Sequence, residues 1–200
     1  MQHAIVMGGA RLTAETLVID TPWQSAWRPE LVGTLLFLIK GNQVLLIHKK
    51  TGHGAGRING PGGKLEPGEG VIAGACREMY EEVGLTITDA RVGAEMHFVE
   101  RNGPQWLGFG LTASRFTGSL IETREAKPFW CKIDEIPYDR MWPDDALWLP
   151  RLLSRDTVTV EVGHYLFENE VLLEHQFVKV PRSIWRNFGA AGQASVLPKV

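Results

Sequence analysis

Residues 63–85 constrain this chain more than any other segment of it. They read GKLEPGEGVIAGACREMYEEVGL, and the apolar spacing predicts a helix on which Glu78, Glu81 and Glu82 crowd one polar face. Like charges in this arrangement repel one another and weaken the helix, whereas a hard divalent cation would convert them into an oxygen-rich site. The alternative is an ordinary solvated helix face on which Arg77 pairs with Glu81.

The same segment meets every fixed position of the Nudix box, so it resembles the Nudix hydrolase family. The resemblance implies a hydrolase that uses Mg²⁺, or alternatively Mn²⁺, to acidify a water for in-line attack on phosphorus. It also implies that Arg77 orients the glutamates and that Glu69 has a structural role. The catalytic residues implied in this way are Arg77, Glu78, Glu81 and Glu82, and the metal ligands are the Gly62 carbonyl, Glu78, Glu81, Glu82 and, from outside the box, Glu125. Glu125 could equally be an ordinary surface glutamate, and the glycines before the helix a simple turn.

Hydrophobic periodicity predicts one α+β domain with a mixed central sheet between helices, an α/β/α sandwich. The resemblance to the Nudix family implies that the acidic helix belongs to that fold's catalytic loop-helix-loop. The predicted helix would pack through Ile72, Cys76, Met79 and Val83 and end at Gly84 in a left-handed cap. Strands are predicted over 32–39, 43–48, 92–100, 107–116 and 129–133, with a second helix over 147–153. A closing hairpin is predicted over 157–166 and 171–178, with its turn near Asn169.

The 200 residues suit one Nudix domain over 31–180, with an N-terminal extension over 1–30 and a C-terminal tail over 181–200. The extension could contribute one extra strand at 16–20. A net charge of −2 argues against polymeric nucleic acid as a partner and leaves a small nucleotide substrate possible. Cys76 and Cys131 match neither a disulfide framework nor a zinc site. With no segment of membrane-spanning character, we expect a cytoplasmic protein that does not bind a membrane and is a monomer or a homodimer.

Two further segments, 49–64 and 129–153, resemble the animal oxidised-purine nucleoside triphosphatases, a MutT-related family. This likeness implies that Asn59, Trp142, Asp144 and Asp145 hold the base. An asparagine amide can donate to and accept from a purine edge, and a tryptophan offers a stacking face. The substrate-binding set implied is Thr34, Lys49, Asn59, Pro61, Gly62, Gly63, Lys64, Trp142, Pro143, Asp144 and Asp145.

The adjacent carboxyls Asp144 and Asp145 are the most informative pair in that set. Two carboxyls in a semi-apolar pocket would not both ionise easily, so one could stay protonated and donate a hydrogen bond. Such a pair suits 8-oxoguanine and 2-hydroxyadenine alike. The alternative is that residues 143–145 form only a turn and a helix N-cap.

The expected activity is hydrolysis of an oxidised purine triphosphate to a monophosphate and pyrophosphate. Departures from the family at His53, Ile58, Pro61 and His97 predict a more polar, reshaped pocket wall and leave the base preference open. One alternative is a Nudix hydrolase acting on another nucleotide, such as a methylated or normal purine triphosphate, a dinucleoside polyphosphate or a nucleotide sugar. The other is a non-catalytic nucleotide-sensing module.

Overall fold

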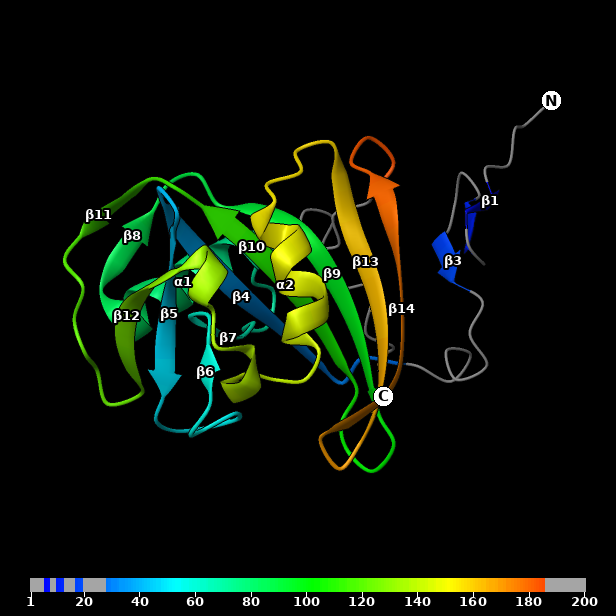
Figure 1. Cartoon of the computed structure of the whole chain (residues 1–200), viewed down its shortest axis with the longest axis horizontal. Coiled ribbons are helices and arrows are strands. Elements are labelled where there is room, and N and C mark those ends of the chain that lie inside the picture. Colours follow the sequence, from blue (N-terminus) through cyan, green and yellow to red (C-terminus); the bar gives the residue numbers. More distant parts are fainter. Residues whose placement is uncertain (1–5, 8–9, 13–16, 20–27, 186–200) are drawn as a thin grey trace.

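A nine-stranded mixed sheet forms the centre of the computed structural model, which describes residues 6–7, 10–12, 17–19 and 28–185 (Figure 1). The main strands follow the order β12-β5-β4-β10-β9-β13-β14. The pairs β4–β10 and β9–β13 are parallel, and the other neighbours on this path are antiparallel. These strands are β4 (Leu31–Lys40), β5 (Gln43–Lys49), β9 (Arg91–Glu100), β10 (Trp106–Ala113), β12 (Ala126–Lys132), β13 (Thr159–Glu168) and β14 (Val171–Pro181).

The glycine-rich segment 52–64 adds two short strands to the central sheet. β6 (Ile58–Asn59) pairs with β5, and β7 (Gly62–Lys64) pairs with β4. β8 (Leu85–Ile87) and β11 (Phe116–Gly118) form a separate two-stranded sheet. β1 (Val6–Met7), β2 (Ala10–Leu12) and β3 (Leu17–Ile19) form a three-stranded sheet near the N-terminus, and β3 lies within the predicted extra strand.

Two helices cover opposite faces of the central sheet, which confirms the predicted α/β/α arrangement (Figure 1). α1 (Val71–Val83) packs Ala75 and Met79 into a core with Leu36 of β4. α2 (Asp145–Leu153) packs Trp148 into a second core, where its ring meets Phe37 of β4 edge-on at 5.7 Å between centroids. Alternate residues of β4 therefore supply the two cores, as expected for a strand buried on both faces. Short 3-10 helices η2 (Ile133–Glu135) and η3 (Tyr138–Arg140) lead from β12 toward α2.

Local turn chemistry matches the sequence at the ends of these elements. Gly41, at the β4–β5 turn, has φ 62°, and Gly84 ends α1 in the left-handed region at φ 78°. Both conformations favour glycine because it lacks a Cβ. The closing hairpin turns at Asn169 and Glu170, which also have positive φ.

The structure differs from the predicted elements in several places. β12 and α2 begin earlier than predicted, at Ala126 and Asp145. The strand predicted over 107–116 ends at Ala113, because the carboxylate of Asp89 accepts the backbone N–H groups of Ser114 and Arg115 and bends the chain. The packing face of α1 is also rotated from the prediction. Ile72 is 43% exposed, whereas Glu82, which was placed on the polar face, is buried.

Both cysteines are free and half-buried, as the sequence predicts. Within the described ranges, no helix is long and apolar enough to cross a membrane. Most of the predicted C-terminal tail lies outside the described residues.

The rotated face of α1 gives a stability prediction. We expect Met79→Ala to lower the free energy of unfolding by roughly 2–5 kcal/mol, because Met79 is fully buried and truncation leaves a cavity. Ile72→Ala, the matched control on the same helix, should cost less than about 1 kcal/mol. Urea unfolding of both variants measures the difference, and equal losses would contradict the observed orientation of α1.

Candidate active site

Arg77 lies on the acidic face of α1 and contacts Glu78 and Glu81 of that helix, as well as Glu69, which precedes it. Its Nε and Nη2 atoms donate to both carboxylate oxygens of Glu69 at 2.9 and 2.8 Å. Its Nη1 atom donates to Glu78 and to Glu81, each at 2.9 Å. A fourth contact, from Nη2 to the Lys64 carbonyl at 3.1 Å, joins the helix to β7. The guanidinium thus fixes the positions of carboxylates that would otherwise repel one another.

Glu82 is neutralised by a different cation. It is 1% exposed, and one carboxylate oxygen accepts the Gly62 N–H at 2.9 Å. The other oxygen accepts a short hydrogen bond from Nζ of Lys49 on β5. A buried carboxylate needs such partners because desolvation of an unpaired charge is costly. Glu82 therefore ties β5, β7 and α1 together.

The glycine at position 63 lets the backbone pass directly over Glu78. A Cβ built at Gly63 would lie 2.5 Å from the Glu78 carboxylate, so no larger residue fits without displacing it. Burial raises the pKa of Glu78, and the nearby Glu82 and Glu81 add to this, while Arg77 opposes it. The hydrogen bonds from Arg77 lower the pKa of Glu69.

The donor set of this cluster fits a hard divalent cation. Carboxylate and carbonyl oxygens are the ligands that Mg²⁺ prefers, and a cation would offset both the burial and the repulsion that raise the pKa of Glu78. In the described part of the chain no three acidic, histidine or cysteine side chains already converge as metal ligands. Instead, Arg77 and Lys49 take up the carboxylate oxygens.

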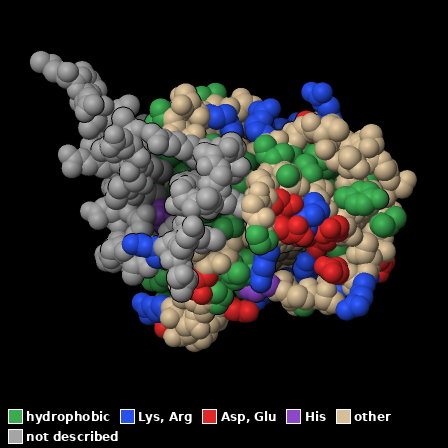
Figure 2. Space-filling model, turned by 180° about the vertical axis from the view of Figure 1, so that it is seen from behind, with side chains coloured by type: hydrophobic (Ala, Val, Ile, Leu, Met, Phe, Trp, Pro, Cys, Tyr) green, Lys and Arg blue, Asp and Glu red, His purple; other side chains and the backbone are tan. Residues whose placement is uncertain are grey.

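A cavity of about 600 Å³ adjoins the acidic helix and extends to the N-terminal end of α2. Figure 2 shows acidic side chains gathered around basic ones on the face of the molecule over α1. Of the residues that the sequence assigned to the site, those that line the cavity are Thr34, Lys49, Asn59, Gly62, Gly63, Lys64, Glu78, Glu125, Trp142, Asp144 and Asp145. The other residues assigned to the site do not line the cavity, namely Pro61, Arg77, Glu81, Glu82 and Pro143.

Asp144 and Asp145 are both buried where α2 begins. The Trp148 indole N–H donates to Asp144 at 2.9 Å, and the backbone N–H of Trp142 donates to Asp145 at 2.9 Å. Asp144 occupies the N-cap position, but its side chain makes no capping hydrogen bond, so the N-cap alternative does not explain it. Burial raises the pKa of Asp144, and burial together with the neighbouring Asp144 raises that of Asp145. The pair therefore holds a proton at a higher pH than ordinary aspartates do.

Two polar side chains on β4 and β6 face the same cavity. Thr34 is 2% exposed, and among the described residues its hydroxyl has no hydrogen-bond partner. Buried hydroxyls are normally paired, so this one is available to a ligand. The Oδ1 atom of Asn59 accepts the N–H of Gly60 at 2.9 Å, which fixes the plane of its amide.

A stack of three rings at the cavity was not foreseen from the sequence. The imidazole of His53 lies parallel to Trp106 at 5.3 Å and to Trp142 at 4.9 Å between ring centroids. The guanidinium of Arg57 lies 4.3 Å from the Trp142 ring. Trp106 is far from both partners in sequence and belongs to no motif, so only the tertiary structure reveals it.

The expectation that His97 contributes to the pocket wall is wrong. On β9, Met96 and Phe98 line the cavity, and the alternation of a strand turns His97 to the other face. There its Nε2 lies 2.7 Å from Glu95 and its ring meets His164 at 4.3 Å. Ile58 is also absent from the wall and is buried in the core beside α2.

Comparison with known proteins agrees with this geometry. A model of the NUDIX domain matches residues 29–152. The chain is 36% identical over 138 residues to the oxidized purine nucleoside triphosphate hydrolase of Mus musculus, covering 68% of this chain and 86% of that protein. The protein of the same description from Danio rerio is 34% identical, covering 74% of this chain and 94% of its own length. A MutT protein from Bacillus halodurans has the same fold, with a TM-score of 0.64 at 24% identity, over 74% of this chain and 97% of that one. The chain belongs to the Nudix hydrolase family.

The buried carboxyl pair predicts an unusual pH dependence of stability. Because the pKa of each group is raised in the folded state, the folded protein binds more protons than the unfolded chain between about pH 4 and the raised values. The free energy of unfolding should therefore fall as the pH rises through this window, by up to about 1.4 kcal/mol per pH unit for each proton held.

In Asp144→Asn/Asp145→Asn this component should be absent. Urea unfolding from pH 4.5 to 8 measures the slopes, with the exposed Asp139→Asn as the control. Parallel curves for the wild type and the double variant would show that both aspartates titrate normally.

Proposed function

We propose that this Nudix hydrolase cleaves oxidised purine nucleoside triphosphates to a monophosphate and pyrophosphate, with Mg²⁺ as its cofactor. The observation that carries the proposal is one cavity lined both by the acidic-helix segment and by a buried pair of proton-holding carboxyls. The first chemistry suits a polyphosphate and the second a base edge. The mouse and zebrafish relatives, whose descriptions name oxidized purine nucleoside triphosphates, support the same substrate class.

On the phosphate side, the chain supplies cations and backbone groups. Lys49 and Lys64 line the cavity and would bind phosphate oxygens, while Arg77 holds Glu78 and Glu81 in place. Glu78, Glu81 and Glu82, with the Gly62 carbonyl and Glu125, would hold the divalent ion. When bound, that ion supplies charge neutralisation and a more acidic water.

On the base side, the carboxyl pair would read the Watson–Crick edge. Because the pair keeps a proton, it presents a hydrogen-bond donor and acceptors together. It could therefore bind purines whose edges carry different donors and acceptors, such as 8-oxoguanine and 2-hydroxyadenine. Asn59 would bond the opposite part of the base, and Trp142 would stack on it. The hydroxyl of Thr34 supplies a further donor or acceptor within the cavity.

The His53 stack is the observation that favours a different base preference. An imidazole between two tryptophans provides a polar edge where the animal family resembled in sequence has an aromatic side chain. A methylated or normal purine triphosphate is therefore the second candidate. The specificity constant for 8-oxo-dGTP against dGTP decides between them, and a ratio near one would refute the oxidised-purine assignment.

We expect Glu82→Gln to lower turnover by roughly a hundredfold or more, because it removes charge from the proposed metal site. Nucleotide binding measured by calorimetry should change little, because Glu82 is not part of the base pocket. The control is Glu122→Gln, which removes an exposed glutamate paired only with a surface lysine. Turnover unchanged in Glu82→Gln would refute the catalytic assignment.

Substitutions in the base pocket should affect the KM for a purine nucleotide more than the KM for a pyrimidine nucleotide. Asn59→Ala and Asp144→Asn are each expected to raise the KM for 8-oxo-dGTP roughly tenfold, since each removes a hydrogen bond to the base. The KM for a pyrimidine triphosphate should change far less, and Asp139→Asn should change neither. Equal increases for both nucleotides would contradict the proposed pocket.

A further inference from the structure

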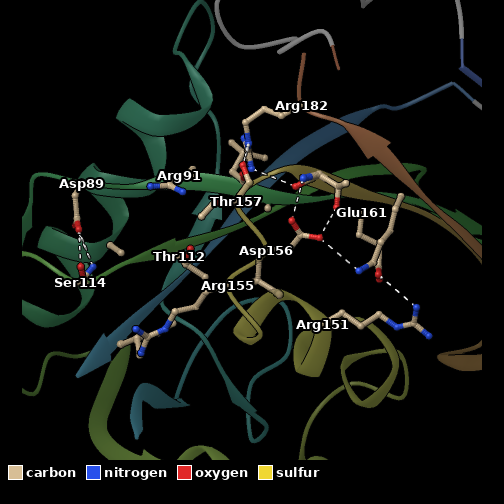
Figure 3. A pocket seen from close by; sticks show the side chains of 17 residues that line it. Asp89, Arg91, Thr112, Ser114, Arg151, Arg155, Asp156, Thr157, Glu161 and Arg182 are labelled. Carbon is tan, nitrogen blue, oxygen red and sulfur yellow. Dashed lines mark hydrogen bonds and ion pairs between the residues drawn. The ribbon is translucent and has the colours of Figure 1, made fainter. Parts of the chain in front are cut away.

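A second cavity, of about 160 Å³, lies at the C-terminal end of α2 (Figure 3). The strands that border it are β9 and β13 at their beginnings and β10 and β14 at their ends. It shares no lining residue with the cavity at the acidic helix. The two cavities therefore lie at opposite ends of α2.

Positive charge exceeds negative charge in this second cavity. The cationic residues of its lining are Arg91, Arg151, Arg155, Lys179 and Arg182, against the acidic Asp89, Asp156 and Glu161. Two of the acidic groups, Asp89 and Asp156, already have hydrogen-bond donors, whereas neither carboxylate oxygen of the buried Glu161 has one among the described residues. Asp89 accepts from Ser114 and Arg115, and Asp156 accepts the backbone N–H groups of residues 158 and 159 and the Thr159 hydroxyl. Lys179 lies 3.5 Å from Asp156, and Arg151 lies 3.5 Å from Glu161.

Three arginines of the lining have no carboxylate partner among the described residues. Arg155 donates only to the Gly41 carbonyl at 3.2 Å, and Arg182 donates to backbone carbonyls, among them that of Val92 at 2.7 Å. Arg91 is exposed, and no hydrogen bond or ion pair joins its side chain to the described chain. In the view of Figure 3, Thr112 lies between Arg91 and Arg155, and Thr157 lies beside Arg182. Burial lowers the pKa of Arg182 and the like charge of the nearby Arg91 lowers it further, while Asp156 opposes the shift.

Arg155, which lines the cavity, has a strained backbone conformation. Arg155 directly follows the C-cap Ser154 of α2 and has φ 60°, in the left-handed region. Glycine is the residue favoured at this position, since a side chain there costs free energy. An arginine in place of glycine is consistent with a role for its side chain.

We propose that this cavity is a binding site for a small phosphate-bearing anion, held by Arg91, Arg155 and Arg182. Guanidinium groups present paired donors whose geometry matches phosphate oxygens, and the hydroxyls of Thr112 and Thr157 add neutral donors. The anion would also relieve the repulsion between Arg91 and Arg182. Inorganic phosphate, pyrophosphate and the phosphate of a nucleoside monophosphate share this chemistry.

Amide NMR shifts of the full chain test the proposal without metal present. Titration with phosphate, pyrophosphate or a nucleoside monophosphate should produce saturable shifts at Arg91, Thr112 and Thr157, and sodium chloride of equal ionic strength should not. The relative dissociation constants identify which source of phosphate fits best. Shifts at Gly62 and Gly63 report any binding at the other cavity separately.

Two variants and one control separate a specific site from general charge. Arg155→Gly suits the left-handed backbone and should retain the fold, yet weaken anion binding roughly tenfold, as should Arg91→Gln. Arg115→Gln removes a neighbouring charge that is 81% exposed and outside the lining, and should leave the affinity unchanged. Shifts that do not saturate, or affinities that both site variants preserve, would overturn the proposal.

Discussion

The neutralisation of closely spaced carboxylates is the constraint on which the rest of this structure depends. Arg77 contacts Glu69, Glu78 and Glu81 together, and Lys49 with the Gly62 amide contacts the buried Glu82. These contacts join β5, β7 and α1. The side chains that neutralise the carboxylates therefore also hold the three elements in place. A cation bound at the proposed metal site would meet carboxylates that are already oriented, which would lower the entropic cost of binding.

The central sheet converts this local arrangement into a complete site. β4 supplies Thr34 to the cavity and alternate apolar residues to the cores under both helices. α2, on the opposite face from α1, brings Asp144 and Asp145 to the same cavity. The residues proposed for polyphosphate chemistry and those proposed for base recognition thus come from opposite faces of one sheet, and the sheet fixes the distance between them.

Local patterns predicted much of this fold, and long-range contacts explain the exceptions. The hairpin at Gly41, the cap at Gly84 and the acidic helix follow from neighbouring residues alone, and so does the predicted layering. The burial of Glu82 could not be predicted, because it depends on Lys49 from a distant strand. Helical periodicity likewise placed Ile72 in the core, whereas packing against β4 selects a face rotated toward Val71 and Ala75.

The candidate site shows the same division. Residues carried by a motif or by a family resemblance, such as Glu78 and Asp144, line the cavity as expected. His97 does not, because one step along a β-strand reverses the direction of a side chain. Trp106 and the arginines at the C-terminal end of α2 belong to no sequence motif. Their partners are distant in sequence, so only the tertiary structure reveals these clusters.

In the proposed base pocket, the imidazole of His53 occupies a place on Trp142 that a bound base would take. Its ring already has a tryptophan on either side, at 5.3 and 4.9 Å between centroids. A purine that stacks on Trp142 from that side must displace the histidine, so one aromatic contact replaces another and little net stacking energy is gained. In the proposed pocket, discrimination between bases would then rest on the carboxyl pair and Asn59, and substrate entry would require the imidazole to leave its place between the tryptophans.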